Sequence, residues 1–160
     1  MFRRLLCLFQ RKQSPTLGVQ LYYRILAPET LGAVLGICAL PDTLTGRFAA
    51  LSLSAAVVLH GRADRATAER DLVGALVADL DVALRENSLG DASVKKQTTN
   101  HAAALYGRLR AFERGLNNLE DLSAALSRNL YADAPNIQQQ RALPTILPAM
   151  QTLLHEGITQ

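Results

Sequence analysis

The sequence predicts an all-α fold, in which an irregular bundle of about six to seven helices forms a single domain. Leucines recur every four residues over long stretches, as on the buried face of an amphipathic helix. Aromatic residues make up only 5% of the 160 residues and Trp is absent, so the core volume must come from Leu, Ala and Val, as helix packing favours. Hydrophobic residues make up 49%, enough to build a core.

Local signals define three helices in the first half of the chain. These helices are predicted over residues 17–27, 30–37 and about 43–61. Pro15 marks a linker before the first helix, and Pro28 ends that helix. Asp42 and Thr43 follow Pro41 and predict a turn with an N-cap for the third helix.

Three further helices are predicted in the second half, over residues 66–86, 93–115 and 119–131. The first is the clearest, with Leu72, Leu76, Leu80 and Leu84 on one face, and Gly90 marks the break after it. The remaining residues carry Pro144 and Pro148, and an interior proline costs about 3 kcal/mol in a helix. The predicted organisation is therefore an arm and linker over 1–16, a helical domain over 17–135 and a kinked or broken helical extension over 136–160.

The positive charge is concentrated in the first 24 residues. They contain five basic and no acidic side chains, whereas the rest of the chain contains 12 basic and 14 acidic side chains. The body is nearly neutral, so the net charge of +3 does not predict sequence-specific nucleic-acid binding. Cys7 and Cys38 are too few for a disulfide scaffold and are typical of a reducing compartment.

No transmembrane helix is expected, but the N-terminal arm is a candidate membrane contact. The uncharged run 48–61 has 14 residues, and a spanning helix needs roughly 20. The apolar piece 5–9 is shorter than the about 7–15 residues of a secretory signal. A basic amphipathic arm can lie at a lipid interface; a solvated terminus, a helix packed on the body and a mitochondrial transit segment are the alternatives. The candidate contact residues are Phe2, Arg3, Arg4, Leu5, Phe9, Arg11 and Lys12.

The sequence lacks the motifs of enzymes and metal sites. Its three histidines are too far apart in sequence for the ligand spacing of a helical metal site, and its two cysteines form no CxxC. P-loop, dinucleotide-binding and nucleophile-elbow motifs are absent. Asp79 and Asp81 diverge by about 200° on a regular helix, so they cannot hold one ion together. We therefore predict no enzymatic activity, no cofactor and no bound metal; the alternative is an enzyme whose site is split among helices.

Two segments carry the most specific signal. The first is Leu40-Pro41-Asp42-Thr43-Leu44-Thr45-Gly46-Arg47-Phe48. The second joins Asp79, Asp81 and Leu84-Arg85-Glu86 to Leu89-Gly90-Asp91, Val94, Lys96 and Tyr106-Gly107-Arg108. With His60 and Asn129-Leu130-Tyr131, their order and spacing over roughly residues 17–135 resemble the ubiquinol–cytochrome c chaperone family. The chain departs from the family pattern at Ala49, where Asp is usual, and at Thr98-Thr99-Asn100, where basic residues are usual.

The resemblance implies an all-helical assembly chaperone without a cofactor of its own. Such a protein binds and stabilises newly made cytochrome b during biogenesis of the respiratory ubiquinol–cytochrome c reductase (bc1) complex. The implied location is cytoplasmic and peripheral to the inner membrane, with a mitochondrial location as the alternative. Mitochondrial relatives act with a small partner protein and near the ribosome. The alternative function is a generic helical protein-binding module that serves another pathway at the membrane surface.

The candidate client-binding residues are polar motif residues that a helical core does not require. They are Asp42, Arg47, Asp79, Asp81, Arg85, Asp91, Lys96 and Arg108. Those between residues 79 and 96 lie at the end of one predicted helix and the start of the next, so they can converge on one surface.

Each candidate also has a purely structural interpretation. Asp42 can cap a helix, and Arg47 and Arg108 can form ion pairs within the bundle, because a buried charge must be paired. Arg85 and Lys96 can simply neutralise the three aspartates on an exposed surface.

Other motif residues are expected to serve the fold. We predict that Gly46, Gly90 and Gly107 serve close packing or turns. Tyr106 and Tyr131 are expected in the core, with hydroxyl groups that reach a polar partner.

Overall fold

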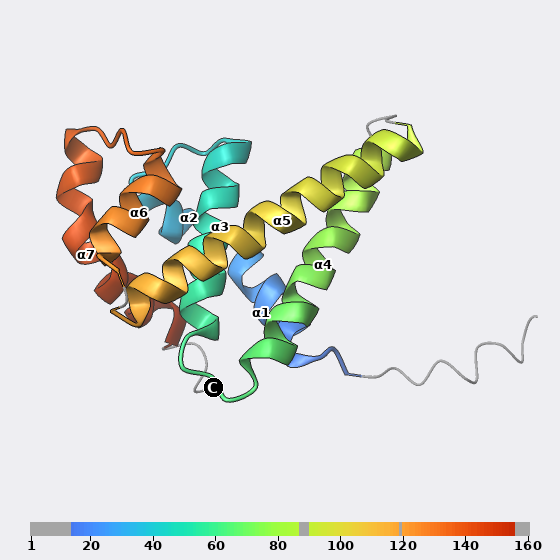
Figure 1. Ribbon diagram of the computed structural model, residues 1–160, viewed down its shortest axis with the longest axis horizontal. Helices are drawn as coiled ribbons and strands as arrows, with labels where there is room; N and C mark the ends of the chain where they lie inside the picture. The colour runs from blue at the N-terminus through green and yellow to red at the C-terminus, as the bar shows by residue number, and fades with distance from the viewer. Residues whose placement is uncertain (1–13, 87–89, 119, 156–160) are drawn as a thin grey trace, which may run out of the picture.

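The computed structural model describes residues 14–86, 90–118 and 120–155, and every regular element in these ranges is an α-helix. The all-α prediction is therefore confirmed, with seven helices in the described residues (Figure 1). They are α1 (Leu17–Leu26), α2 (Pro28–Ile37), α3 (Leu44–Leu59), α4 (Arg65–Glu86), α5 (Asp91–Leu116), α6 (Leu122–Tyr131) and α7 (Ile137–His155). In these ranges, none of the helices is both long and apolar enough to cross a bilayer. The candidate membrane-contact residues, Phe2 to Lys12, lie outside the described residues.

The helix bounds follow local chemistry. Pro28 ends α1 and also occupies the first turn of α2, where its missing N–H breaks no hydrogen bond, so α2 begins before the predicted residue 30. Asp121 caps α6 by accepting hydrogen bonds from the backbone N–H groups of Ser123 (2.8 Å) and Ala124 (3.5 Å). The cap explains why α6 begins at residue 122 rather than at 119.

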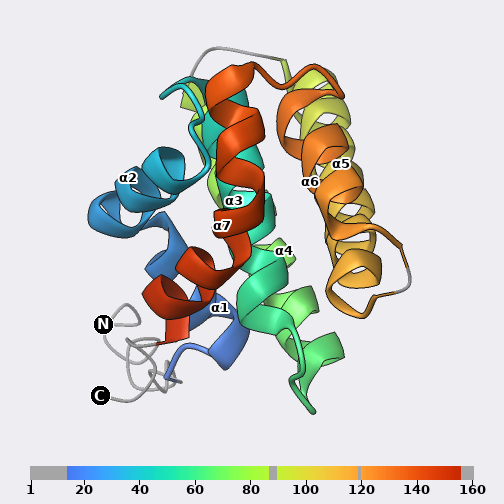
Figure 2. The ribbon, with the colours of Figure 1, turned by 90° about the vertical axis from the view of Figure 1, so that its left-hand side faces the viewer.

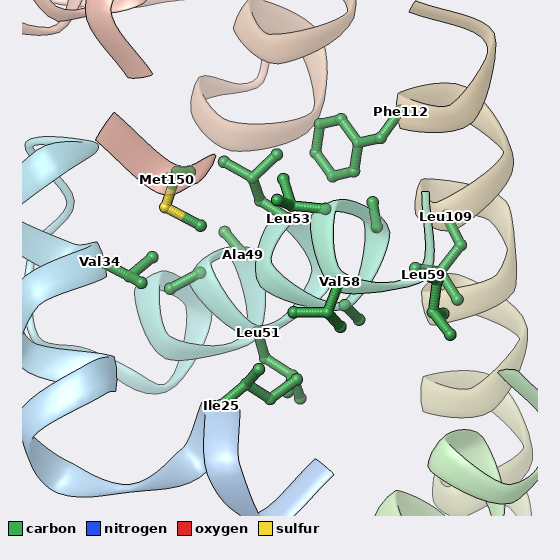
Figure 3. Packing of buried hydrophobic residues seen from close by; sticks show 14 of the residues in the cluster. Ile25, Val34, Ala49, Leu51, Leu53, Val58, Leu59, Leu109, Phe112 and Met150 are labelled. Atoms are coloured by element: carbon green, nitrogen blue, oxygen red, sulfur yellow. The ribbon is translucent and has the colours of Figure 1, made fainter. Parts of the chain in front are cut away.

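α3 is the centre of the fold, and the other six helices pack around it (Figures 1 and 2). Residues 49–59 are all buried. Figure 3 shows Leu51 facing Ile25 of α1, and Leu59 against Leu109 of α5. A helix that is surrounded on all sides needs no polar face, which explains why this stretch lacks charged residues without being a membrane span.

α4 and α5 form a long hairpin whose far end projects from the body (Figure 1). α1 packs along the nearer part of α4. Gly18 permits this contact, since a Cβ atom there would lie 2.2 Å from the carbonyl oxygen of Ala68. The last buried residue of α4 is Leu76, and Leu80 is still packed against the core, so only the final turns of this helix are mostly exposed.

α7 is one continuous helix although it contains Pro144 and Pro148, and its ribbon changes direction along its length (Figure 2). It packs against α2, α3 and α6. Its buried residues are Ile146, Met150 and Leu154. The predicted boundary between a domain and an extension near residue 135 stays a prediction, but α7 does contribute to the common core.

Two hydrogen bonds tie distant segments together. The buried Tyr131 hydroxyl of α6 donates to the carbonyl oxygen of Cys38, after α2, at 2.6 Å. This contact confirms the expectation that the Tyr131 hydroxyl reaches a polar partner, and burial raises the pKa of Tyr131 to about 12. The second hydrogen bond joins α1 to the end of α7, where Arg24 donates to the carbonyl oxygen of Leu154 at 3.0 Å.

Candidate functional site

The structure distributes the candidate polar residues over four places. One cluster lies at the tip of the α4–α5 hairpin, and a second group lies where α4 meets α1. An ion pair lies at the start of α3, and Arg108 lies where α5 crosses α3. Of the residues that sequence position grouped together, the structure brings Asp81, Arg85 and Asp91 into contact and places Asp79 against α1.

The hairpin tip holds a three-residue ion cluster. Arg85 Nε donates to Asp81 Oδ2 at 2.7 Å and Arg85 Nη2 donates to Asp81 Oδ1 at 3.3 Å, while Arg85 Nη1 contacts Asp91. The hydrogen bonds with Asp81 and then Asp91 raise the pKa of Arg85. Asp91 also lies in the first turn of α5, where the helix dipole favours a negative charge. The cluster thus links the end of α4 to the start of α5 across residues 87–89.

This cluster is exposed, with side-chain exposures of 40% for Asp81, 51% for Arg85 and 87% for Asp91. The interpretation that Arg85 neutralises neighbouring aspartates therefore holds for two of them. Lys96 is exposed on α5 and forms no ion pair within the described part of the chain. Within the described residues, the tip thus combines a satisfied ion cluster with Lys96, a cation that forms no ion pair there.

Asp79 does not belong to the tip cluster. It faces α1, where Asp79 Oδ1 accepts a hydrogen bond from the Tyr23 hydroxyl at 3.3 Å. The charge of Asp79 raises the pKa of Tyr23. The pKa of the neighbouring Tyr22 is raised first by burial and then by Asp79. As helix geometry predicts, Asp79 and Asp81 point in different directions. Asp79 joins α4 to α1, and Asp81 joins α4 to α5 through Arg85.

At the start of α3, Thr43 is the N-cap and Asp42 is not. The Thr43 hydroxyl accepts a hydrogen bond from the Gly46 N–H at 3.1 Å. Asp42 instead binds Arg47 through two hydrogen bonds, of 2.5 and 3.1 Å. The hydrogen bonding to Arg47 lowers the pKa of Asp42. The ion pair of Arg47 is therefore on the surface and not inside the bundle, with Asp42 as its partner.

Arg108, in the second of the two motif segments that resemble the family, contacts Phe48 in the first. Its guanidinium group lies 4.9 Å from the centre of the Phe48 ring, and the His101 ring lies edge-on to Phe48 at 5.7 Å. Partial burial lowers the pKa of Arg108. Its Nη1 atom is buried and has no hydrogen-bond partner among the described residues. The predicted ion pair is thus replaced, in these residues, by a cation–π contact.

Sequence reasoning missed Phe48 and His101 as neighbours of this site. With Asn100 and Ala104 they line a shallow hollow of about 280 Å³ on the surface of α5. The signal that could have found them is the spacing of seven residues between His101 and Arg108, which places both on one face of α5.

The three motif glycines differ in role. Gly46 serves close packing as predicted, since a Cβ atom would lie 2.0 Å from the Pro41 carbonyl oxygen. Gly90 precedes α5 as its N-cap residue. Gly107 lies within α5, and a Cβ there would meet nothing within 4 Å. The packing prediction is therefore wrong for Gly107.

The described residues contain no group of three or more His, Cys, Asp or Glu side chains close enough to hold a metal ion. Cys38 is buried, and burial raises the pKa of its thiol to about 12, which disfavours the reactive thiolate.

Comparison with known proteins assigns the family. No curated protein and no solved structure matches the chain. The model of the family described as ubiquinol–cytochrome C chaperone matches residues 37–154, from the last residue of α2 into the end of α7. The chain therefore belongs to the ubiquinol–cytochrome c chaperone family, and its role is that of a chaperone for a protein client in bc1-complex assembly.

Proposed function

We propose that this chain binds newly made cytochrome b and stabilises it until it enters the bc1 complex. The observation that carries the proposal is the family match over residues 37–154, joined by the order of the polar motifs. A chaperone of this kind acts by mass action, because it binds the immature client more tightly than the finished complex. It needs an exposed surface with apolar and polar groups rather than a catalytic pocket.

We further propose that the hairpin tip is one contact surface for cytochrome b. Asp81, Arg85, Asp91 and Lys96 present both signs of charge on a thin projection that other elements do not cover. The neighbouring face of α4 adds exposed apolar area at Val82, which is 57% exposed. A helical hairpin does not need this density of charge to form its turn, so a partner contact accounts for it.

The basic arm supports a peripheral location at the cytoplasmic face of the inner membrane. Each basic residue near an anionic leaflet contributes about 1 kcal/mol, and salt screens this attraction. Binding to vesicles that contain anionic lipid should therefore weaken with salt and with removal of charge at Arg3, Arg4, Arg11 and Lys12. Equal binding by a chain that lacks residues 1–14 would contradict an arm-mediated contact.

Gene deletion tests the function directly. We expect lower levels of assembled bc1 complex and of spectroscopic cytochrome b, and recovery when the intact gene is restored. Affinity purification during synthesis of the complex should recover cytochrome b as the main client. Normal bc1 levels together with recovery of unrelated membrane proteins would instead indicate a generic helical binding module.

A further inference from the structure

The two helices of the long hairpin differ in the sign of their charge (Figure 1). α4 carries three basic and five acidic side chains, whereas α5 carries five basic and two acidic side chains. The two acids of α5 are Asp91 and Glu113, so residues 92–112 contain no acidic side chain. Exposed helix surfaces normally mix both signs of charge. The acid-free stretch therefore makes α5 a basic helix beside an acidic one.

Helical spacing defines one outward face of α5. The positions 96, 100, 103, 107 and 110 recur at intervals of three and four residues, and every one of them is exposed. Val94, Leu105 and Phe112 are buried on the opposite side of the helix. We call this outward surface the α5 face, and it is formed by Lys96, Asn100, Ala103, Gly107 and Arg110.

The two cations of the α5 face have no acidic partner within the described part of the chain. Lys96 and Arg110 form no ion pair there, whereas Arg65 and Arg85 of α4 each contact two carboxylates. Glu113, the next acid after Arg110 along α5, is bound by Arg65 at 3.1 Å. The α5 face thus presents positive charge that the fold itself does not neutralise.

The surface between these two cations is uncharged and low. Asn100, Ala103 and Gly107 form it, and a Cβ atom at Gly107 would meet nothing within 4 Å. Fourteen residues separate Lys96 from Arg110, which corresponds to about 21 Å along the helix. A second helix that lies along the α5 face can therefore come close to its backbone and place carboxylates at both ends.

A hollow beside Arg110 offers room for one of these carboxylates. It has a volume of about 390 Å³ and lies between α4 and α5, where Arg70, Tyr106 and Arg110 are among its lining residues. The Tyr106 hydroxyl forms no hydrogen bond within the residues that the structure describes, so it remains available as a donor. Arginine and tyrosine donors at one place suit a carboxylate, which accepts several hydrogen bonds.

The surroundings of the α5 face disfavour nucleic acid and lipid surfaces as its ligand. The five acidic side chains of the adjacent α4 would repel an extended polyanion or a flat anionic bilayer. The aromatic residues of α5 offer no stacking platform on this face, because Phe112 is buried and Tyr106 is half-buried at its edge. A narrow ligand that contacts α5 without covering α4 avoids this repulsion.

We propose that the α5 face binds an acidic α-helix of a partner protein, with carboxylates placed against Lys96 and Arg110. The partner helix lies along Asn100, Ala103 and Gly107. Arg110 is about 28 Å from the start of α5, so this surface extends well beyond the ion cluster at the hairpin tip. The inference goes beyond the proposed function and does not depend on cytochrome b as the client.

A synthetic acidic helix tests the surface. The probe is a fluorescent alanine–glutamine peptide of about 20 residues that carries glutamates on one face, and it is titrated with the full chain at low salt. The chain should bind this peptide, and high salt should weaken the binding. Lys96→Glu and Arg110→Glu should each weaken it by about tenfold or more, while thermal unfolding shows a folded protein. A peptide with glutamine in place of every glutamate should not bind.

Arg141→Glu is the matched control. Arg141 is an exposed cation of α7, a helix that does not contact α5, and this variant changes the net charge by the same amount as Arg110→Glu. It should bind the acidic peptide as the unchanged chain does. A double variant, Lys96→Glu with Arg110→Glu, should instead bind a peptide that carries lysines in place of the glutamates. This reversal would show that the charges of the face choose the partner.

Several results would overturn the inference. They are absence of acidic-peptide binding by the unchanged chain, equal weakening by Arg141→Glu, and equal binding of the glutamine peptide. Tighter binding to single-stranded RNA or to anionic vesicles than to the peptide, lost in Arg110→Glu, would assign the face to a different ligand. A dimer of the unchanged chain that Arg110→Glu converts to a monomer would show that the acidic α4 of a second copy is the occupant. The assay contains no cytochrome b, so failure of the proposed function leaves its outcome unaffected.

Discussion

The central helix α3 and the tip of the α4–α5 hairpin are held in place in different ways: α3 by buried packing and the tip by exposed ion pairs. α3 is buried over residues 49–59 and contacts every other helix of the described chain. The tip has no fully buried residue in α4 beyond Leu76, and an exposed ion cluster links its two helices. Stability is therefore concentrated in the body and in buried residues such as Val94 of α5, while the exposed side chains of the tip can change with little effect on the fold. This division leaves the tip available for a partner.

Truncation of a large side chain in α3 should have the largest effect on stability. Leu53 is 1% exposed, so Leu53→Ala removes buried surface and leaves a cavity. We expect a loss of about 2–5 kcal/mol in the free energy of unfolding, measured by denaturant titration. Val82→Ala near the tip is the control, since an exposed position should change stability by no more than about 0.5 kcal/mol. Equal losses at the two positions would remove the contrast between body and tip.

Two of the three motif glycines, Gly46 and Gly107, provide the next test. Gly46→Ala places a Cβ atom against the Pro41 carbonyl oxygen at the start of α3, and the required backbone shift should reduce stability by about 1–3 kcal/mol. Gly107→Ala meets open space in α5 and should increase stability by about 0.5–1 kcal/mol. Thermal unfolding of both variants measures the opposite signs. Destabilisation by Gly107→Ala would reveal packing that the structure does not contain.

Removal of the Tyr131 hydroxyl should have an intermediate effect. In Tyr131→Phe the ring remains, but the Cys38 carbonyl loses the donor that holds it at 2.6 Å. We expect a loss of about 1 kcal/mol, because a buried acceptor is left without its partner. Tyr23→Phe is the control, since its hydrogen bond to Asp79 is exposed and 3.3 Å long. A loss at Tyr23 as large as that at Tyr131 would contradict this difference.

The fold could be predicted from the sequence because its signals are local. Leucine spacing defined α4, and Pro28 separated α1 from α2. The start of α6 was misplaced because Leu119 continues the apolar spacing, whereas the Asp121 cap decides the boundary. Periodicity therefore predicts that a helix is present, whereas the residue at which the helix begins or ends depends on single side-chain hydrogen bonds.

The candidate sites were less predictable because they depend on tertiary geometry. The position of Arg108 over Phe48 is set by the crossing of α5 and α3, which no local pattern reports. Likewise, Asp42 had two available roles, and the choice between capping and pairing depended on the neighbouring Thr43 taking the cap. Residue type and spacing identified polar residues of interest but not their partners.

Variants of the tip cluster should leave stability nearly unchanged and reduce client capture. Asp81→Ala, Arg85→Ala and Asp91→Ala each remove part of an exposed ion cluster, whose contribution to folding is small because water and salt screen it. If the tip contacts cytochrome b, capture should fall by about tenfold or more. Asp64→Ala is the matched control, because it breaks the exposed pair with Arg62 at the base of the hairpin. Normal capture by folded tip variants would end the tip hypothesis.

The smallest expected effect is the pH dependence that Asp42 contributes. Hydrogen bonding to Arg47 lowers the pKa of Asp42 below its ordinary value, so the folded state favours the carboxylate. The resulting stabilisation is present above the ordinary pKa and is lost as the pH falls through the lowered one. Since both side chains are exposed, the effect should be small and should shrink further in high salt. The free energy of unfolding is measured as a function of pH for the unchanged chain and for Asp42→Asn, and the difference between the two curves is the contribution of Asp42. The curves should converge at low pH; a difference that grows as the pH falls would have the wrong sign for a carboxylate stabilised by Arg47.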